Sequence, residues 1–170
     1  MTGLTPLTPQ SAAVVAGWVH SRADAVLAGG PQFPFPLTAD LLLGIAAEPE
    51  WRVFTLADER GRVVATASLY TKDGGRLLRI GRVIVDPDRR GEGWGRRVME
   101  ELLALTDADP SVLATELGVF THNELARGLY ERLGYRPVPG GVSVEVDGER
   151  WQTDELIRHG PDRGAAPSSS

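Results

Sequence analysis

The chain has 170 residues, of which 42% are hydrophobic, enough for one globular domain that buries roughly 70% of its unfolded surface. Its 18 Lys and Arg against 23 Asp and Glu give a net charge of -5, which disfavours nucleic-acid binding because no overall basic field is present. The lack of cysteine excludes disulfides, thiol nucleophiles and zinc-thiolate sites, and the three histidines are too far apart to share a metal. With no signal peptide and no apolar stretch of the roughly 20 residues that cross a bilayer, we expect a soluble cytoplasmic protein.

Two helices are predicted in the N-terminal part of the chain. The first begins after Thr8, which precedes a proline, and its apolar residues recur at helical spacing up to about residue 26. The second covers residues 39–47, with Thr38 as its capping residue. Three prolines within residues 31–36 forbid regular structure, so the segment between the helices is predicted to be a loop.

A meander of three antiparallel strands is predicted next. Residues 51–57, 63–71 and 76–85 are rich in β-branched and aromatic side chains. The short segments between them contain the Asp and Gly residues that are typical of hairpin turns.

A glycine-rich loop follows the third strand. Gly91, Gly93 and Gly95 precede a helix whose apolar face is predicted to include Val98 and Leu105. Backbone N–H groups of such a loop, at the positive end of a helix, form a binding site for phosphate or pyrophosphate. The glycines alone are weak evidence, because three glycines also make a simple tight turn.

The remaining elements alternate between strand and helix. A strand over residues 112–120 follows the helix, and a right-handed crossover places it parallel to the strand over residues 76–85. A helix over residues 123–133 comes next. Two strands over residues 142–146 and 150–157 then flank an Asp-Gly hairpin signal.

The order of elements predicts a mixed α/β (α+β) fold. Its central sheet is mostly antiparallel, contains one parallel strand pair beside the glycine loop, and is flanked by helices. One domain is expected over residues 1–160, followed by a disordered tail over residues 161–170. Ligands bind in such sheets where adjacent strands separate, outside their carboxyl ends.

The familiar nucleotide-binding motifs fit the glycine loop poorly. No Gly-Lys-Ser/Thr follows the glycines, and their spacing is not that of a dinucleotide motif. The pattern Arg90-x-x-Gly93-x-Gly95, placed after Val83-x-Val85, instead resembles the GNAT superfamily of acyl-CoA-dependent N-acetyltransferases.

A second part of the resemblance lies in the helix over residues 123–133. Asn, then Ala, then Tyr, closed by Leu-Gly-aromatic, is similar to the second signature of the same family. Asn123 and Tyr130 are seven residues apart, which at about 100° per residue places both on one stripe of the helix with Ala126 between them. The structural alternative is a capping Asn and a core Tyr.

The resemblance implies a GNAT fold in which the parallel strand pair is splayed, with acetyl-CoA as co-substrate and no metal. It implies that the loop backbone binds the CoA pyrophosphate, that the strand edge before it bonds to the pantetheine arm, and that Asn123 binds or orients pantetheine. The cofactor-binding residues that it implies are Val83, Ile84, Val85, Arg90, Gly91, Gly93, Trp94, Gly95, Arg96, Asn123 and Tyr130.

The resemblance also implies catalytic roles. Tyr130 would be the general acid that protonates the departing CoA thiolate, although a phenol of pKa about 10 is a weak acid toward a thiolate of pKa near 8.5. Many family members use a glutamate as general base, at a position where this chain has Gly118. Glu116, on the same strand face, is the nearest replacement and His122 is a second candidate; a base acting through water, or none, stays open.

The binding site for the acceptor is the least specified part of the sequence. Arg79 and Arg82 interrupt an apolar strand, so they either bind an acidic group of the acceptor and influence its amine, or pair with internal carboxylates. Phe33 and Phe35 lie in the proline-rich loop, either over the edge of the core or as part of a lid over a ligand. These four residues are the candidate contacts for the acceptor.

The predicted function is the transfer of an acetyl group from acetyl-CoA to a primary amine by direct attack in a ternary complex. The protein would be a cytoplasmic monomer or homodimer that binds neither nucleic acid nor membrane. One alternative is a catalytically weak GNAT domain that binds or senses acyl-CoA. The other is a protein that binds nucleotide phosphates.

Overall fold

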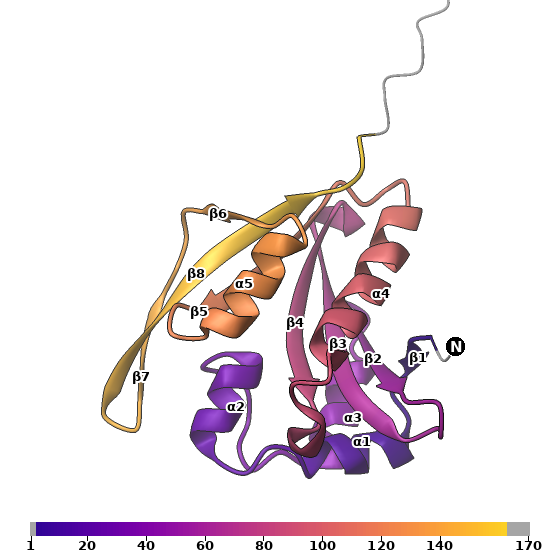
Figure 1. The fold of residues 1–170 in the computed structure, drawn as a ribbon, viewed down its shortest axis with the longest axis vertical. Helices are drawn as coiled ribbons and strands as arrows, with labels where there is room; N and C mark the ends of the chain where they lie inside the picture. The colour runs from indigo at the N-terminus through magenta and orange to yellow at the C-terminus, as the bar shows by residue number, and fades with distance from the viewer. Residues whose placement is uncertain (1–2, 163–170) are drawn as a thin grey trace, which may run out of the picture.

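A twisted mixed sheet forms the centre of the protein, with helices on both of its faces (Figure 1). The computed structural model describes residues 3–162, so the predicted tail lies outside the described residues from position 163 onward. The strands are β1 (Thr5–Pro6), β2 (Trp51–Ala57), β3 (Val63–Lys72), β4 (Leu77–Val85), β5 (Ala114–Phe120), β6 (Arg136–Val138), β7 (Ser143–Val146) and β8 (Glu149–His159). The α-helices are α1 (Pro9–Ala16), α2 (Arg22–Gly29), α3 (Ala39–Ala47), α4 (Trp94–Ala108) and α5 (Glu124–Arg132), and the 3-10 turns are Asp73–Gly75 and Pro87–Arg89.

The strand order confirms the predicted fold class. The sheet runs β1-β2-β3-β4-β5-β8-β6, with β7 paired to β8, and β4 with β5 is a parallel pair while the other pairs are antiparallel. Two strands were not predicted, β1 and β6. They have two and three residues, too few for an alternating pattern, and neither pairs with the strand that follows it directly through a tight turn.

The prediction of one helix from Thr8 to about residue 26 is wrong. The chain forms α1 and α2 instead, because α1 ends at Gly17 and Ser21 starts a new helix by accepting a hydrogen bond from the Asp24 N–H. The predicted caps of α1 and α3 are confirmed: Thr8 accepts from the backbone of Ser11, and Thr38 from that of Leu41.

Helix α4 packs on the sheet through a narrower stripe than predicted. Val98, Met99, Leu102 and Leu103 are buried, whereas Leu105 is 40% exposed. At 100° per residue the buried set is centred between Val98 and Leu103, and Leu105 falls at the edge of that stripe. The prediction of Leu105 as a core residue is therefore wrong.

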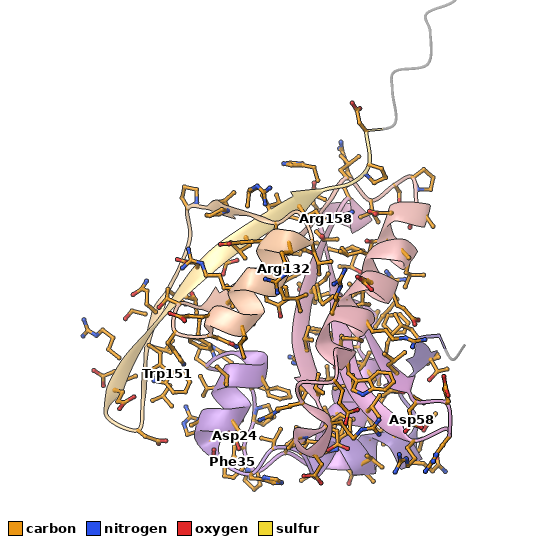
Figure 2. The ribbon with its side chains drawn as sticks, in the orientation of Figure 1. Asp24, Phe35, Asp58, Arg132, Trp151 and Arg158 are labelled. Carbon is orange, nitrogen blue, oxygen red and sulfur yellow. The ribbon has the colours of Figure 1, made fainter. Side chains whose placement is uncertain are left out.

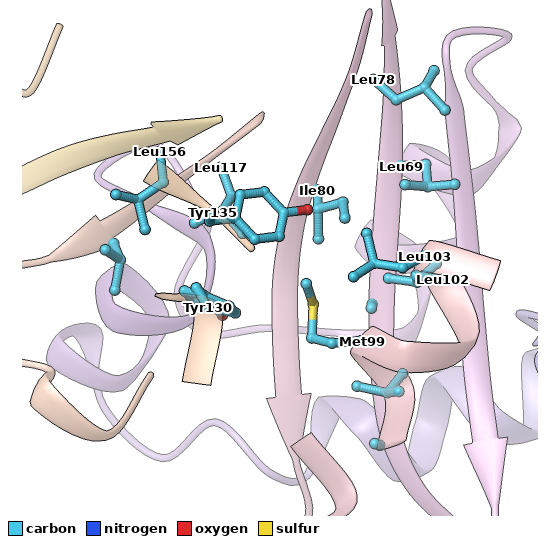
Figure 3. Close-up of a cluster of buried hydrophobic side chains, with 14 of the residues drawn as sticks. Leu69, Leu78, Ile80, Met99, Leu102, Leu103, Leu117, Tyr130, Tyr135 and Leu156 are labelled. Atoms are coloured by element: carbon cyan, nitrogen blue, oxygen red, sulfur yellow. The ribbon is translucent and has the colours of Figure 1, made fainter. Parts of the chain in front are cut away.

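The two faces of the sheet carry separate hydrophobic clusters. Helices α4 and α5 cover one face together with the inward residues of β2–β5 and β8, whereas α1, α2 and α3 cover the other. Figure 3 shows the first cluster, where Tyr130 and Tyr135 lie between the strand residues Leu117 and Leu156 and the α4 residue Met99. Because both faces are covered, a ligand reaches the centre of the sheet only where two strands separate.

A buried carboxylate ties the β2–β3 turn to the segment that precedes the glycine loop. Asp58 (Figure 2) is 6% exposed and accepts hydrogen bonds from the backbone N–H groups of Arg60 and Arg62 and from the side chains of Arg62 and Arg89. These bonds hold the pKa of Asp58 well below its usual range, and the bond from the Arg62 backbone contributes most. Burial acts in the opposite direction and would raise the pKa.

Stability in acid is expected to depend on Asp58. A carboxyl group whose pKa is lower in the folded than in the unfolded protein stabilises the fold fully above its unfolded pKa, near 4, and loses that contribution as the pH falls. Replacing Asp58 by Asn should therefore lower the melting temperature at pH 7, and the difference from the wild type should shrink between about pH 5 and pH 2. Thermal unfolding followed across that range checks this, and a difference that does not vary with pH would contradict it.

Candidate active site

Strands β4 and β5 separate in the middle of the sheet. Their parallel pairing extends only over Leu77–Arg79 and Ala114–Glu116. Beyond this point β4 continues to Val85 and β5 to Phe120, and residues 80–85 and 117–120 line the two sides of a cleft of about 790 Å³. The cleft lies at the carboxyl ends of a parallel pair, where sheets of this kind bind ligands.

A β-bulge turns the second half of β4 over. Thr66 pairs with Ile84 and Ser68 with Gly81. Two residues of β4, Arg82 and Val83, therefore lie opposite one residue of β3, Ala67. Before the bulge, the even-numbered residues Leu78 and Ile80 pack toward α4. After it the alternation is reversed: Val83 packs toward α4, and Ile84 belongs to the cluster on the opposite face. Arg82 has a φ of 51°, which non-glycine residues rarely adopt.

The glycine loop forms the start of α4. Gly91 and Gly93 have φ values of 82° and 88°, where a side chain would strain the backbone. Gly93 is the N-cap of α4 and, having no side chain, leaves the first N–H groups of the helix without a side-chain cap. The first turn of α4 holds no acidic residue, and Arg90 and Arg96 line the cleft beside it. Free N–H groups, the helix dipole and two arginines together favour an anion at this end of the cleft.

Helix α5 contributes the opposite wall through Asn123 and Tyr130. Asn123 is the N-cap of α5 and accepts a hydrogen bond from the Ala126 N–H at 3.3 Å, which leaves its amide nitrogen free to donate into the cleft. The capping interpretation of Asn123 is thus correct, and it is compatible with ligand binding because the two ends of the amide act separately.

Tyr130 faces the cleft from within the core. It is 9% exposed, its ring lies 6.1 Å from that of Tyr135, and its hydroxyl has no hydrogen-bond partner within residues 3–162. Burial, with a smaller contribution from Tyr135, raises the pKa of Tyr130 to about 12. The phenol therefore stays protonated at neutral pH and can donate a hydrogen bond.

An ion-pair cluster lies at the point where β4 and β5 separate. Arg79 binds Glu155 of β8 through two hydrogen bonds, of 2.8 and 3.1 Å, and Glu116 of β5 through one of 3.2 Å, while Lys72 also binds Glu116. Burial alone would raise the pKa of Glu116, but Lys72 and Arg79 outweigh it, so the pKa is lowered. The hydrogen bond to Glu155 is the main cause of the raised pKa of Arg79.

Glu155 occupies the space that a side chain at Gly118 would fill. A Cβ atom at Gly118 would lie 2.9 Å from Nη2 of Arg79 and 3.0 Å from Oε1 of Glu155. Glu155 is directly opposite Gly118 in the β5–β8 pairing, and both residues line the cleft. A carboxylate of the neighbouring strand thus fills the space beside Gly118.

Arg82, in contrast, has no carboxylate partner. Its guanidinium carbon lies 3.9 Å from the centre of the Trp51 ring and 5.1 Å from that of Phe33. Nη1 is buried, and the side chain of Arg82 forms no hydrogen bond or ion pair within residues 3–162. Of the two arginines on β4, Arg79 pairs with internal carboxylates as the structural alternative predicted, and Arg82 does not.

Most of the residues expected at the site lie around one cleft. Its lining includes every expected cofactor-binding residue and both β4 arginines: Val83, Ile84, Val85, Arg90, Gly91, Gly93, Trp94, Gly95, Arg96, Asn123, Tyr130, Arg79 and Arg82. Glu116 and Phe33 are not part of the lining, since Glu116 is held in its ion pairs and Phe33 is buried beneath Arg82. Phe35 lies at the edge of the molecule, is 41% exposed and also does not line the cleft (Figure 2).

Two residues were missed in the sequence, Glu155 and Trp51. Glu155 stands in an ordinary alternating strand, and only the register of β8 against β5 brings it beside Gly118. Trp51 opens β2 and reaches the cleft through its contact with Arg82. No local pattern marks either residue, and the glycine at position 118 left open whether another carboxylate, water or no base at all takes its place.

Neither a metal site nor a membrane span is evident in the part of the chain that the structure describes. Within residues 3–162, no three or more His, Asp or Glu side chains gather in a way that could hold a metal ion. None of the helices over the same residues combines the length and apolar character needed to cross a bilayer.

Comparison with known proteins agrees with this geometry. The family model described as Acetyltransferase (GNAT) family matches residues 22–135. A UPF0039 protein of Schizosaccharomyces pombe is 36% identical over 81 residues, which are 48% of this chain and 52% of that protein. The chain therefore spans about half the length of this curated relative.

Solved structures share the fold at low sequence identity. The spermidine N-acetyltransferase of Vibrio cholerae in complex with CoA and spermine has a TM-score of 0.77 and 17% identity, covering 93% of this chain and 95% of that one. The ribosomal-protein-S18-alanine N-acetyltransferase of Escherichia coli has a TM-score of 0.73 and 18% identity, covering 100% and 99% of the two chains. At such identities the likeness concerns the fold alone.

Proposed function

This chain belongs to the GNAT acetyltransferase family, and from that premise we propose that it transfers the acetyl group of acetyl-CoA to a primary amine by direct attack in a ternary complex. One observation supports this most strongly: the cleft between β4 and β5 joins an anion-binding loop on the α4 side to a charged cluster on the α2 side. Acetyl-CoA supplies the activated acetyl thioester. The residues of the chain bind acetyl-CoA, orient the amine, accept its proton and donate a hydrogen bond to the leaving thiolate.

Cofactor binding is assigned to the glycine loop and to the free edge of β4. The N–H groups at the start of α4, with Arg90 and Arg96, would hold the pyrophosphate through charge-assisted hydrogen bonds. Because β5 leaves β4 after Arg79, the backbone of residues 83–85 has no strand on that side and can bond to the pantetheine arm as a strand partner would. The Asn123 amide nitrogen would bind the same arm from α5.

Tyr130 is proposed to donate a hydrogen bond to the departing thiolate. With its pKa at about 12 and that of a thiol near 8.5, complete transfer of the proton would cost about 5 kcal/mol. A hydrogen bond to the developing negative charge on sulfur requires no complete transfer and is strongest in the transition state. Protonation of the thiolate can then be completed by water.

Two glutamates are candidates for the proton acceptor. Formation of the N–C bond makes the attacking nitrogen acidic, so a carboxylate next to it can take up the proton. Glu155 lines the cleft, whereas Glu116 is turned toward Lys72 and Arg79 and lies outside the lining. These positions favour Glu155 as the base and Glu116 as the residue that keeps Arg79 in place.

The two glutamates form a matched pair of variants, since each change removes one partner of Arg79. Glu155→Gln is expected to lower kcat by about 100-fold, because it removes the proton acceptor. Glu116→Gln is expected to keep kcat within about 3-fold and to lower the melting temperature, because it leaves Lys72 without its carboxylate. Steady-state kinetics of both variants with one amine decide between them, and the opposite pattern would assign the base to Glu116.

The proposed function is tested by the release of CoA thiol from acetyl-CoA over a panel of polyamines, amino acids and peptides with free N-termini. Turnover above the rate without amine, together with an acetylated product in the mass spectrum, supports the proposal. CoA binding without turnover on any amine would instead favour a protein that binds or senses acyl-CoA.

A further inference from the structure

The proposed function does not explain one feature of the cleft, the buried positive charge of Arg82. The chain has an excess of acidic over basic residues, yet the side chain of this arginine forms no ion pair within residues 3–162. The two acidic residues that line the cleft are engaged elsewhere: Asp24 accepts a hydrogen bond from the His20 N–H, and Glu155 binds Arg79. A charge that is partly withdrawn from water and unpaired is costly, so its retention calls for a partner outside the chain.

The surroundings of Arg82 fix the orientation of its guanidinium group. Trp51 packs against it at 3.9 Å, and Phe33, at 5.1 Å, is buried and packed against Gly29. Aromatic rings hold the planar group by its faces and offer no acceptor to its N–H edge. Burial lowers the pKa of Arg82 to about 10, so the group still carries its charge at neutral pH.

The backbone at Arg82 is held in a strained conformation. Within residues 3–162, three non-glycine residues have positive φ: Asp73 and Asp147 lie in turns, whereas Arg82 lies within β4. The bulge directs its side chain to the face of Trp51 and Phe33, away from the α4 side. Strained backbone of this kind is concentrated at active sites and ligand-binding sites.

The position of Arg82 separates it from the pyrophosphate site. The glycine loop follows the end of β4 and faces α4, whereas Arg82 lies before residues 83–85 and faces the elements of the N-terminal half. An anion bound at Arg82 would therefore approach from the side of α2 and the segment Gly30-Pro31, which also lines the cleft. That is the side opposite to the one assigned to CoA.

We propose that Arg82 binds a carboxylate of the acceptor, so that the acceptor is a small amine that also carries an acid group, as an amino acid does. The inference rests on the proposed acetyl transfer and adds the chemical class of the acceptor. The in-plane N–H groups of the guanidinium pair with the two carboxylate oxygens, while Trp51 and Phe33 keep its plane fixed. The amine end then extends toward Glu155, which lines the same cleft.

The test compares three matched sets of amines with the wild-type protein: the standard L-amino acids, their carboxamides and the amines that remain after loss of the carboxyl group. We expect at least one amino acid to exceed its own carboxamide in kcat/KM by about 10-fold or more. The amine of a carboxamide is the less basic of the two, so this bias works against the expected result. A preferred acceptor that lacks a carboxylate would overturn the proposal.

Arg82→Met tests the residue itself, because methionine keeps an apolar contact with Trp51 but has no charge. The variant should lose the preference for acids over amides while its KM for acetyl-CoA stays within about 3-fold of the wild type. Arg82→Lys should retain part of the preference, since it restores the charge without the planar fork. A preference that survives in Arg82→Met would overturn the proposal.

A binding measurement separates this inference from the proposed function. Calorimetric titration of the CoA-saturated protein with the same amino acids and amides requires no turnover. Binding of an acid to the wild type that is lost in Arg82→Met, in a variant that still binds CoA, supports the carboxylate site even if no amine is acetylated. No acid binding to the CoA-saturated wild type would overturn it, whatever the outcome for acetyl transfer.

Discussion

Gly95→Glu is expected to weaken CoA binding by at least about 100-fold while the protein stays folded. Gly95 lies in the first turn of α4 with ordinary helical backbone, and a Cβ there would lie 3.7 Å from the nearest atom, in Val85. A side chain therefore fits. Its carboxylate would occupy the positive end of the helix and repel the pyrophosphate, and an acid at a helix N-terminus does not destabilise the helix.

Gly44→Glu is the matched control for this variant. Gly44 also lies in a helix, α3, with nothing near its Cβ position, and it does not line the cleft. Calorimetric titration with CoA should give the wild-type affinity for Gly44→Glu and little or no binding for Gly95→Glu. Equal affinities in two folded variants would refute the assignment of the loop.

Tyr130→Phe is expected to lower kcat by about 100-fold with little change in the KM for acetyl-CoA. The hydroxyl has no partner within residues 3–162, so its removal leaves no buried group unpaired and the melting temperature should hardly change. Steady-state kinetics and thermal unfolding of the same preparation check both statements. An unchanged kcat would remove Tyr130 from the mechanism.

The control is Tyr135→Phe, which removes the hydroxyl of the neighbouring ring. Tyr135 is fully buried and its hydroxyl shares a hydrogen bond of 2.7 Å with Thr115. Its loss should destabilise the fold by about 1 kcal/mol and leave kcat near the wild-type value. The two variants together separate a hydroxyl that faces the ligand from one that supports the core.

The pH dependence follows from the raised pKa of Tyr130. Because that pKa is about 12, ionisation of the phenol should not reduce activity below about pH 11. The rate should instead rise with pH as the acceptor amine loses its proton. Tyr130→Phe should show the same rise at a lower rate, and a loss of wild-type activity near pH 9 that is absent from this variant would contradict the assignment.

The cofactor side of the site could be predicted because its signals are local. Gly91, Gly93 and Gly95 lie within five positions of one another, and the seven-residue spacing of Asn123 and Tyr130 defines one stripe of one helix. Such patterns depend only on the backbone of a single element, so they appear directly in the sequence.

The acceptor side depends on contacts between distant segments. Arg79, Glu116 and Glu155 come from three strands, and their grouping requires the registers of β4 with β5 and of β5 with β8. A shift of one residue in either register would turn these side chains to the other face. The different environments of Arg79 and Arg82 could not be predicted either. They result from the β-bulge in β4, and no residue pattern in the sequence indicates that bulge.

The bulge at Arg82 also determines where this protein can change in length. Deleting Arg82 or Val83 would leave one residue opposite Ala67 and restore the regular ladder. Ile84 and Val85 would keep their partners and faces, but the extra position that turns the Arg82 side chain toward Trp51 and Phe33 would be lost. The Asp147-Gly148 turn between β7 and β8 does not line the cleft, and both of its residues are in the left-handed conformation of an exposed hairpin. Insertions and deletions among relatives should therefore gather at such turns, and β4 should keep its exact number of residues.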